Sequence, residues 1–196
     1  ISVRLDKKVP AGAGLGGGSS DAACMLQCLD ELFETQLEIT VLSRMAARIG
    51  SDVPFFLHGG AALVEGRGET VTPFASRTDL FGVLVWPDIH SSTAEAYRLV
   101  DEWMEQGGER GIDWPDVRDL QSMYNASVDS WRFRNSFEQP IGRRHPEITA
   151  LIRDFRQAGA AYAAMTGSGS TVFALFEDPE KASRAHALLS VNRAWC

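Results

Sequence analysis

A glycine-rich stretch near the start of the chain reads Pro10-Ala11-Gly12-Ala13-Gly14-Leu15-Gly16-Gly17-Gly18-Ser19-Ser20-Asp21. Before it, Ile1, Val3 and Leu5 alternate with polar residues, which predicts a half-buried strand. After it, apolar residues recur at helical spacing and predict a helix over about residues 20–34. The sequence therefore predicts a strand, a glycine loop and the N-terminus of a helix, in that order.

This order of elements favours binding of a phosphate. Glycine adopts positive φ and lets a ligand approach the backbone closely. Successive backbone amides make a concave anion site, and a helix N-terminus adds about half a positive charge. Ser19, Ser20 and Asp21 are candidate helix caps, and the two hydroxyls are also placed to meet a phosphate or its magnesium ion.

Four other interpretations of the stretch are weaker. A flexible Gly/Ser linker does not usually join a periodic strand to a periodic helix so tightly. Gly12, Gly14 and Gly17 fit the dinucleotide pattern G-x-G-x-x-G, but the preceding segment carries too many charges for a buried strand. No Gly-Lys-Ser/Thr follows, as a P-loop requires. The His-Arg-Asp and Asp-Phe-Gly motifs of protein kinases are absent from the sequence.

The stretch from Pro10 to Ala23 resembles the phosphate loop of the GHMP small-molecule kinases. Its triple glycine before Ser-Ser-Asp-Ala-Ala is most similar to the branch whose acceptor is the 2-hydroxyl of 4-diphosphocytidyl-2-C-methyl-D-erythritol, in the non-mevalonate isoprenoid pathway. The resemblance implies ATP and Mg²⁺ as cofactors. It also implies an ATP-binding loop made of Pro10, Ala11, Gly12, Ala13, Gly14, Leu15, Gly16, Gly17, Gly18, Ser19 and Ser20.

A second segment, Gly50-Ser51-Asp52-Val53-Pro54-Phe55-Phe56-Leu57, places one carboxylate before an apolar patch. Such a carboxylate is partly desolvated unless a cation or amide donors face it. Asp52 also suits the N-cap of a short helix, because Pro54 follows closely. The segment is similar to one in the same branch of the GHMP kinases, which implies that Asp52 is the catalytic base and contacts the substrate.

Three further segments also resemble that branch. Arg67, in a predicted hairpin turn, is an ordinary turn arginine or a phosphate contact. Thr93 begins a predicted helix after Ser92, a position that suits capping, and the resemblance implies contact with the substrate instead. Gly167 and Ser168 lie in a predicted tight turn, and the resemblance implies that this turn packs beside the phosphate loop and contacts the substrate. Ser136 stands where the family usually has aspartate, so the role of that aspartate is not assigned to this chain.

The bulk composition excludes several classes of protein. The formal charge of −7 argues against nucleic-acid and anionic-membrane binding, and no apolar run approaches the ~20 residues of a membrane span. Without a visible signal peptide, we expect a cytoplasmic protein. Cys24 and Cys28 share a face of the predicted first helix, where we expect them to pack in the core.

The remaining pattern predicts an α+β chain. The expected elements are a helix capped by Thr40 and ending at Gly50, a hairpin over 61–74, a buried strand over 81–86, a helix from Ser92, a helix over 146–159, a hairpin over 163–176 and a helix capped by Asp178. The order of the later elements predicts a ferredoxin-like split β-α-β domain.

We expect two domains, residues 1–74 with the ATP loop and residues 75–196. The resemblance implies a first domain similar to domain 2 of ribosomal protein S5. It also implies a preceding segment, with an active-site lysine, that nothing in this chain matches. The predicted function is ATP-dependent phosphorylation of 4-diphosphocytidyl-2-C-methyl-D-erythritol. The alternatives are another GHMP kinase, acting on mevalonate, homoserine or a sugar, and a truncated nucleotide-binding protein without catalysis.

Overall fold

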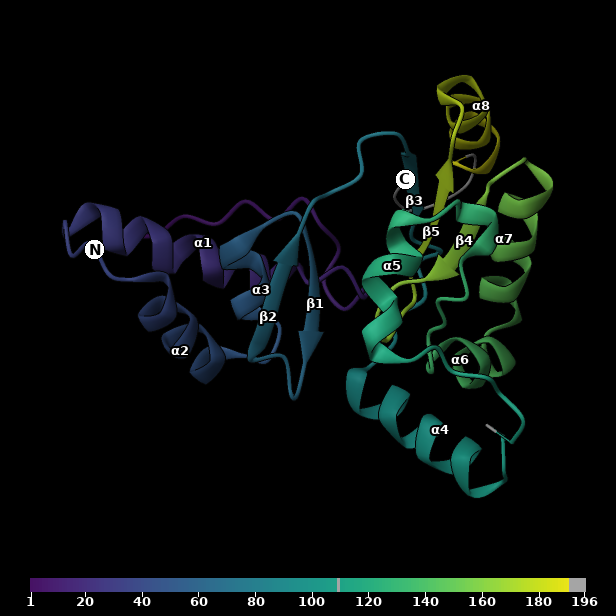
Figure 1. Cartoon of the computed structure of the whole chain (residues 1–196), viewed down its shortest axis with the longest axis horizontal. Helices are drawn as coiled ribbons and strands as arrows, with labels where there is room; N and C mark the ends of the chain where they lie inside the picture. The colour runs from purple at the N-terminus through teal and green to yellow at the C-terminus, as the bar shows by residue number, and fades with distance from the viewer. Residues whose placement is uncertain (109, 191–196) are drawn as a thin grey trace. The chain divides into compact units, whose positions relative to one another are not determined.

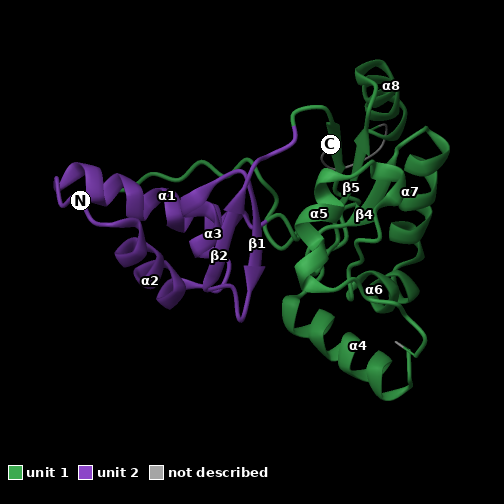
Figure 2. Ribbon diagram, in the orientation of Figure 1, with its two compact units in different colours: residues 1–15, 78–196 green, residues 16–77 purple. Residues whose placement is uncertain are grey.

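The structure is a computed structural model that describes residues 1–108 and 110–190. The chain divides into two compact units, coloured separately in Figure 2. One unit contains residues 16–77, and the other contains residues 1–15 together with 78–196. Within the described residues, no helix combines the length and the apolar character needed to cross a membrane.

The unit of residues 16–77 contains three helices and a hairpin (Figure 1). In chain order these are α1 (Gly17–Leu32), α2 (Ile39–Ile49), α3 (Val53–His58), β1 (Ala61–Glu65) and β2 (Thr70–Phe74). The helices pack on one another through a small apolar cluster that includes Ala23, Leu42 and Val53. The predicted hairpin is confirmed, with Ala61 paired to Phe74 and Glu65 to Thr70.

The other unit is built on a three-stranded antiparallel sheet of order β3-β5-β4. Its elements are β3 (Phe81–Val85), α4 (Thr93–Glu105), η1 (Val117–Asp119), α5 (Leu120–Asn125), η2 (Val128–Ser130), α6 (Glu138–Arg144), α7 (Pro146–Gln157), β4 (Tyr162–Met165), β5 (Val172–Phe176) and α8 (Pro179–Leu189). Because β5 pairs antiparallel to both neighbours, β3 and β4 run parallel with β5 between them. This is the expected split β-α-β arrangement.

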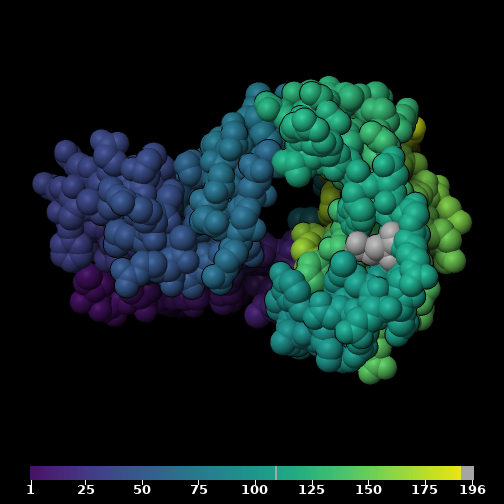
Figure 3. Space-filling model, turned by 60° about the horizontal axis from the view of Figure 1, so that its bottom comes forward, coloured from purple at the N-terminus to yellow at the C-terminus, as the bar shows by residue number. Residues whose placement is uncertain are grey.

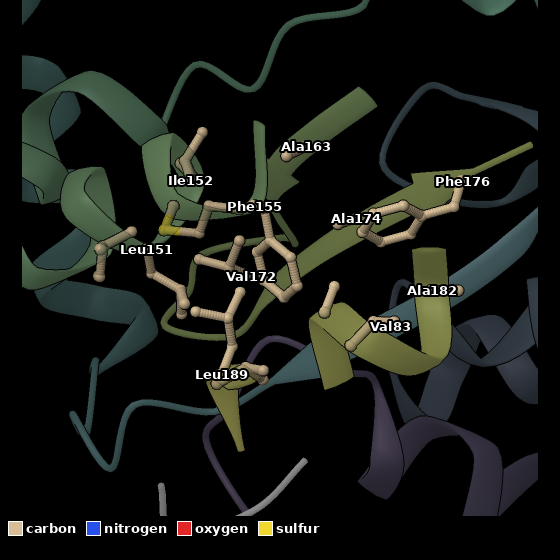
Figure 4. Close-up of a cluster of buried hydrophobic side chains, with 14 of the residues drawn as sticks. Val83, Leu151, Ile152, Phe155, Ala163, Val172, Ala174, Phe176, Ala182 and Leu189 are labelled. Atoms are coloured by element: carbon tan, nitrogen blue, oxygen red, sulfur yellow. The ribbon is translucent and has the colours of Figure 1, made fainter. Parts of the chain in front are cut away.

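One face of that sheet carries the larger core. Val83, Val172, Ala174 and Phe176 alternate with exposed or half-buried residues, so their side chains share one face. Helix α7 packs on β4 and β5, and α8 packs on β3 and β5. Figure 4 shows Phe155 of α7 among these strand residues. Helix α4, in teal, lies on the surface that faces the viewer in Figure 3.

Four local predictions differ from the structure. Residues 1–8 form no strand, and Ile1, Val3 and Leu5 are 84%, 60% and 61% exposed. A strand requires a hydrogen-bonded neighbour, and alternation alone does not supply one. Residue Glu38, not Thr40, occupies the N-cap of α2, because the helix begins at Ile39.

The two remaining differences concern burial. The strand predicted over 81–86 ends at Val85 and is buried on one face only, since Phe81 is 40% and Leu84 38% exposed. Cys24 and Cys28 are both exposed, with their Sγ atoms 4.0 Å apart, so neither packs in the core. The face of α1 that is buried instead carries Ala23 and Leu26.

Candidate active site

Every second residue from Gly12 to Gly16 is a glycine in the left-handed region. Gly12, Gly14 and Gly16 have φ of 69°, 75° and 66°. L side chains rarely adopt this conformation, so the backbone explains why glycine recurs here. Alternation of left-handed and ordinary residues also turns successive amides toward one side of a loop, which is the geometry of an anion site.

The tight turn at residues 166–171 packs directly on the glycine loop. Thr166 Oγ1 donates to the carbonyl of Gly14 at 3.0 Å, and the Thr171 amide donates to the carbonyl of Ala13 at 3.2 Å. A Cβ on Gly14 would lie 2.4 Å from the Thr166 carbonyl oxygen and 2.8 Å from that of Gly169. Gly14 must therefore be glycine for packing as well as for backbone reasons.

The turn itself contains Gly167 and Ser168. Gly167 approaches the carbonyl of Gly14, because a Cβ there would lie 3.1 Å from that oxygen. The Ser168 carbonyl accepts a hydrogen bond of 3.1 Å from the buried Ser91 hydroxyl. The structure thus brings Gly167 and its turn beside the loop, while contact with a substrate remains a prediction.

Helix α1 begins earlier than expected, at Gly17, with Gly16 at its N-cap. The N-cap residue is a glycine without a side chain, and Ser19, Ser20 and Asp21 lie inside the helix, so the prediction that one of them occupies the cap is wrong. Ser20 instead donates its hydroxyl to the carbonyl of Gly17 at 2.9 Å. Because the first amides of a helix lack intrahelical partners, this uncapped end is open to an external acceptor.

Gly16 and Gly18 are glycines for different reasons. A Cβ on Gly16 would lie 2.6 Å from the ring of Phe56 in α3, so this glycine permits helix packing. Gly18 lies in the helix without a positive φ, and a Cβ there would meet nothing within 4 Å. Alanine would therefore fit at Gly18 and would favour the helix, so the folded chain gives no reason for a glycine there.

Asp52 occupies the N-cap position of α3, before Val53 and Pro54. Its carboxylate makes no capping hydrogen bond and is exposed, so the partial desolvation expected from the apolar sequence is not seen. The backbone of Ser51, just before Asp52, lies against the turn of the hairpin, since a Cβ on the buried Gly68 would be 2.1 Å from the Ser51 carbonyl oxygen. The hairpin turn therefore holds the segment that carries Asp52.

Arg67 and Thr93 are both exposed. The backbone amide of Arg67 donates to Glu69 Oε2 at 2.6 Å, within the hairpin turn. The backbone amides of Glu69 and Arg67 lower the pKa of the Glu69 carboxyl. Thr93 begins α4 after Ser92, whose side chain makes no capping hydrogen bond. For both residues, contact with phosphate or substrate remains a prediction.

Two polar residues near the turn were missed in the sequence. Asn135 donates from Nδ2 to the carbonyls of Met165 and Gly167, at 2.8 Å each. Glu138 Oε2 accepts from the Met165 amide at 2.9 Å. The motif around Asn135 was noticed for the serine that follows it, but no local pattern indicates that a residue 30 positions away is its partner.

Trp131 and the aromatic residues around it pack on one another. The ring of Trp131 stacks on Tyr124 at 5.7 Å and meets the edges of Phe133 and Tyr162 at 5.1 and 5.5 Å. Trp114, 40% exposed, lines a cavity of about 360 Å³ beside them. Burial raises the pKa of Tyr162 to about 12, with a smaller contribution from Glu138.

Comparison with known proteins identifies the family. The GHMP kinases N terminal domain matches residues 1–60, and GHMP kinases C terminal matches residues 115–189. The 4-diphosphocytidyl-2-C-methyl-D-erythritol kinase of Treponema pallidum (strain Nichols) is 44% identical over 201 aligned positions, which cover all of this chain and 69% of that protein. The chain belongs to the GHMP kinase family. This family assignment confirms the α+β fold and the resemblance on which the predictions rest.

Other GHMP kinases agree in sequence and in structure. The 4-diphosphocytidyl-2-C-methyl-D-erythritol kinase of Thermodesulfovibrio yellowstonii is 39% identical over 197 positions, covering this whole chain and 68% of the relative. A crystal structure of 4-(cytidine 5'-diphospho)-2C-methyl-D-erythritol kinase has a TM-score of 0.77 at 34% identity, over 95% of this chain and 65% of that one. This GHMP kinase chain therefore spans about two thirds of the length of these relatives.

A more distant structure shows how widely the fold extends. Homoserine kinase from Cytophaga hutchinsonii has a TM-score of 0.70 at 21% identity, over 96% of this chain and 65% of that one. At that identity the likeness shows the GHMP kinase fold alone, and it gives no support to homoserine as the acceptor.

Proposed function

We propose that this chain catalyses ATP-dependent phosphorylation of the 2-hydroxyl of 4-diphosphocytidyl-2-C-methyl-D-erythritol. The observation that carries the proposal is the 44% identity, across the whole chain, to a protein named as that kinase. The predicted alternatives, a kinase for mevalonate, homoserine or a sugar and a nucleotide-binding protein without catalysis, have no comparable support.

The proposed nucleotide site is the glycine loop with the first turn of α1. Its support is the run of left-handed glycines and the uncapped helix end, which together offer amides to an anion. Gly18 adds an independent reason, because a side chain there would occupy open space that a phosphate can fill. In phosphoryl transfer such contacts position the donor and spread the charge of the transferred group.

Mg²⁺ is the proposed metal. Among residues 1–108 and 110–190, no three His, Cys, Asp or Glu side chains come together as a ligand set. The ion would therefore be held chiefly by phosphate oxygens of ATP, as is usual for Mg²⁺ at nucleotide sites. Ser19 and Ser20 are the proposed serine ligands; the Ser20 hydroxyl donates to the Gly17 carbonyl, which leaves its oxygen lone pairs for the ion. Bound Mg²⁺ supplies charge neutralisation between the phosphates.

Asp52 is the proposed general base. In this role its carboxylate would accept the proton of the acceptor hydroxyl, whose oxygen bonds to the γ-phosphorus while the bond from that phosphorus to the leaving ADP breaks. Its position at the start of a short helix, on a segment fixed by the hairpin turn, supports the proposal, because a base must be held in one place to act. Thr93, Gly167 and Ser168 are the remaining proposed contacts to the acceptor.

An assay of ADP release over a panel of acceptors tests the proposal. We expect ADP to form with 4-diphosphocytidyl-2-C-methyl-D-erythritol and not with mevalonate, homoserine or galactose. Mass spectrometry of the product should show one added phosphoryl group. ATP binding without product from any acceptor would contradict the catalytic proposal, and product from another acceptor alone would contradict the proposed substrate.

A further inference from the structure

The turn at residues 166–171 is held by a side chain from a distant part of the sequence. Asn135 uses its whole amide group: Nδ2 donates to the Met165 and Gly167 carbonyls, and Oδ1 accepts from the Phe137 amide at 2.9 Å. If the side-chain amide were rotated by 180°, its oxygen would face two carbonyl oxygens and its NH₂ group would face an N–H. The three partners therefore fix its orientation. Through these bonds Asn135 connects the segment that leads into α6 with Met165, the last residue of β4, and with Gly167 in the turn.

Glu138 completes this attachment. Its Oε2 atom accepts from the Met165 amide at 2.9 Å, while Asn135 satisfies the Met165 carbonyl. Among residues 1–108 and 110–190, strand β4 lies at an edge of the sheet, with β5 as its one strand neighbour. Edge strands leave backbone groups unpaired, and here two side chains pair them at the residue that leads into the turn. We call Asn135 and Glu138 the edge clamp.

The clamped residues directly adjoin the glycine loop. Met165 precedes Thr166, which donates to the Gly14 carbonyl, and Gly167 approaches the same carbonyl. The Gly14 backbone leaves no room for even one methyl group on the side of the turn. Since close-packed groups transmit displacement, movement of the turn also moves Gly14.

We infer that Asn135, assisted by Glu138, is a positioning residue for the glycine loop and acts through the turn at residues 166–171. The inference rests on the proposed ATP-binding function of that loop. It goes further in assigning part of the nucleotide affinity to a side chain that contacts neither the loop nor, by the proposal, the nucleotide. A purely structural role would lower stability alone, whereas a positioning role also changes the affinity of the folded protein.

A double-mutant cycle tests the inference. ATP affinity is measured by calorimetry for the wild-type chain, Asn135→Ala, Thr166→Val and the double variant, with Asn125→Ala as control because Asn125 is an exposed asparagine at the end of α5. We expect each single variant at the turn to raise the Kd for ATP roughly tenfold, which corresponds to the loss of about one hydrogen bond. Because both act through one turn, the double variant should resemble the single variants and fall well short of a hundredfold rise.

Amide hydrogen exchange gives a second readout that does not depend on activity. Asn135→Ala should accelerate exchange of the Gly169 and Thr171 amides, which donate to Thr166 and Ala13, at least tenfold. The Ala182 amide, in the first turn of α8 and bonded to the Asp178 carbonyl, serves as the comparison, and its exchange rate should be unchanged. If Asn135→Ala does not fold, Glu138→Ala replaces it, and Glu138→Gln should restore affinity because it keeps an acceptor for the Met165 amide.

The outcomes separate the inference from the proposed function. Absence of ATP binding by the wild-type chain would overturn the proposed function and, with it, this inference. Wild-type binding with unchanged affinity in a folded Asn135→Ala variant would overturn the inference alone. Independent effects of Asn135→Ala and Thr166→Val, multiplying to about a hundredfold, would also overturn it, since the two residues would then act through separate routes.

Discussion

At the scale of single residues, the structure separates glycines that the fold requires from a glycine that it does not. Gly14 has a positive φ and touches the turn at Thr166, so both the backbone and the packing exclude a side chain. Gly18 is helical and faces open space. At Gly18 the requirements of a ligand can therefore be tested without disturbing the fold.

Gly18→Ala should stabilise the free chain and weaken ATP binding. Alanine is favoured over glycine within a helix by up to about 1 kcal/mol, and here it meets no neighbour. The same methyl group would occupy the proposed phosphate position, so we expect at least a tenfold rise in the Kd for ATP. Urea unfolding and calorimetry measure the two effects.

Two other glycine substitutions serve as controls for Gly18→Ala. Gly82→Ala, at an exposed strand position where a Cβ makes an ordinary contact with Leu175, should leave ATP affinity unchanged. Gly14→Ala should lose both stability and affinity. If Gly18→Ala binds ATP as the wild-type chain does, phosphate does not approach that face of the helix.

Asp52→Asn should lower kcat by roughly 10²–10⁴ in the ADP-release assay, the usual contribution of a general base. Because Asp52 is exposed at a helix start, the isosteric change should preserve the fold and leave the KM for ATP near its wild-type value. Asp129→Asn, at another exposed aspartate, serves as the control. A fully active Asp52→Asn variant would remove Asp52 from the mechanism.

At the scale of helices and strands, the sequence correctly predicted elements whose ends are marked by turn or capping residues. The hairpin over 61–74 has a glycine turn between apolar strands, and Asp178 caps α8 by accepting from the Glu180 and Lys181 amides. The strand expected over residues 1–5 had only alternation to support it, and the structure has no strand there. Pairing between strands depends on residues far apart in the sequence, which a local pattern cannot specify.

In the candidate site, too, continuous motifs can be read from the sequence, whereas contacts between distant segments cannot. The glycine loop, Asp52 and the turn with Gly167 are continuous motifs, so the sequence alone could propose them as site residues. The edge clamp was not found, because the bonds from Asn135 and Glu138 to Met165 join segments about 30 residues apart. The burial of α1 was also misjudged, since the face that carries Cys24 and Cys28 is exposed.

Strand β4 should carry a pH-dependent contribution to stability through Tyr162. Its hydroxyl donates to the Phe133 carbonyl at 3.0 Å, and burial raises its pKa to about 12. The neutral phenol is therefore favoured by folding. Its contribution is complete below the unfolded pKa of about 10 and is lost as the pH rises from about 10 toward 12.

Tyr162→Phe should remove this dependence. The variant should be less stable than the wild-type chain at pH 7, where it lacks the bond to Phe133, and the difference should narrow above pH 10. Urea unfolding at a series of pH values measures it. A constant difference between pH 7 and pH 11 would show that Tyr162 titrates normally.

At the scale of the whole molecule, the net charge and the available side chains bear on how the protein binds Mg²⁺ and the nucleotide. The described residues offer no cluster of metal-ligating side chains, and the formal charge of the chain is −7. We expect the nucleotide to bring most of the ligands for Mg²⁺, as is usual for this ion at phosphate sites. The family assignment rests on the whole chain, whereas each proposed role rests on a few residues.

Removal of Mg²⁺ should abolish phosphoryl transfer. EDTA is expected to stop ADP release and added Mg²⁺ to restore it, because the ion neutralises charge between the phosphates. Calorimetry with MgCl₂ alone should show no binding tighter than about millimolar, since Mg²⁺ at nucleotide sites depends on phosphate oxygens. Tight binding of Mg²⁺ in the absence of ATP would reveal a protein ligand set that the account does not contain.

The most direct test of the central claim is a crystal structure of the chain with Mg²⁺ and a non-hydrolysable ATP analogue. We predict that the triphosphate lies against the backbone amides of residues 12–20, with a phosphate oxygen beside the Cα atom of Gly18. Triphosphate density at any other place, with those amides facing solvent, would contradict it.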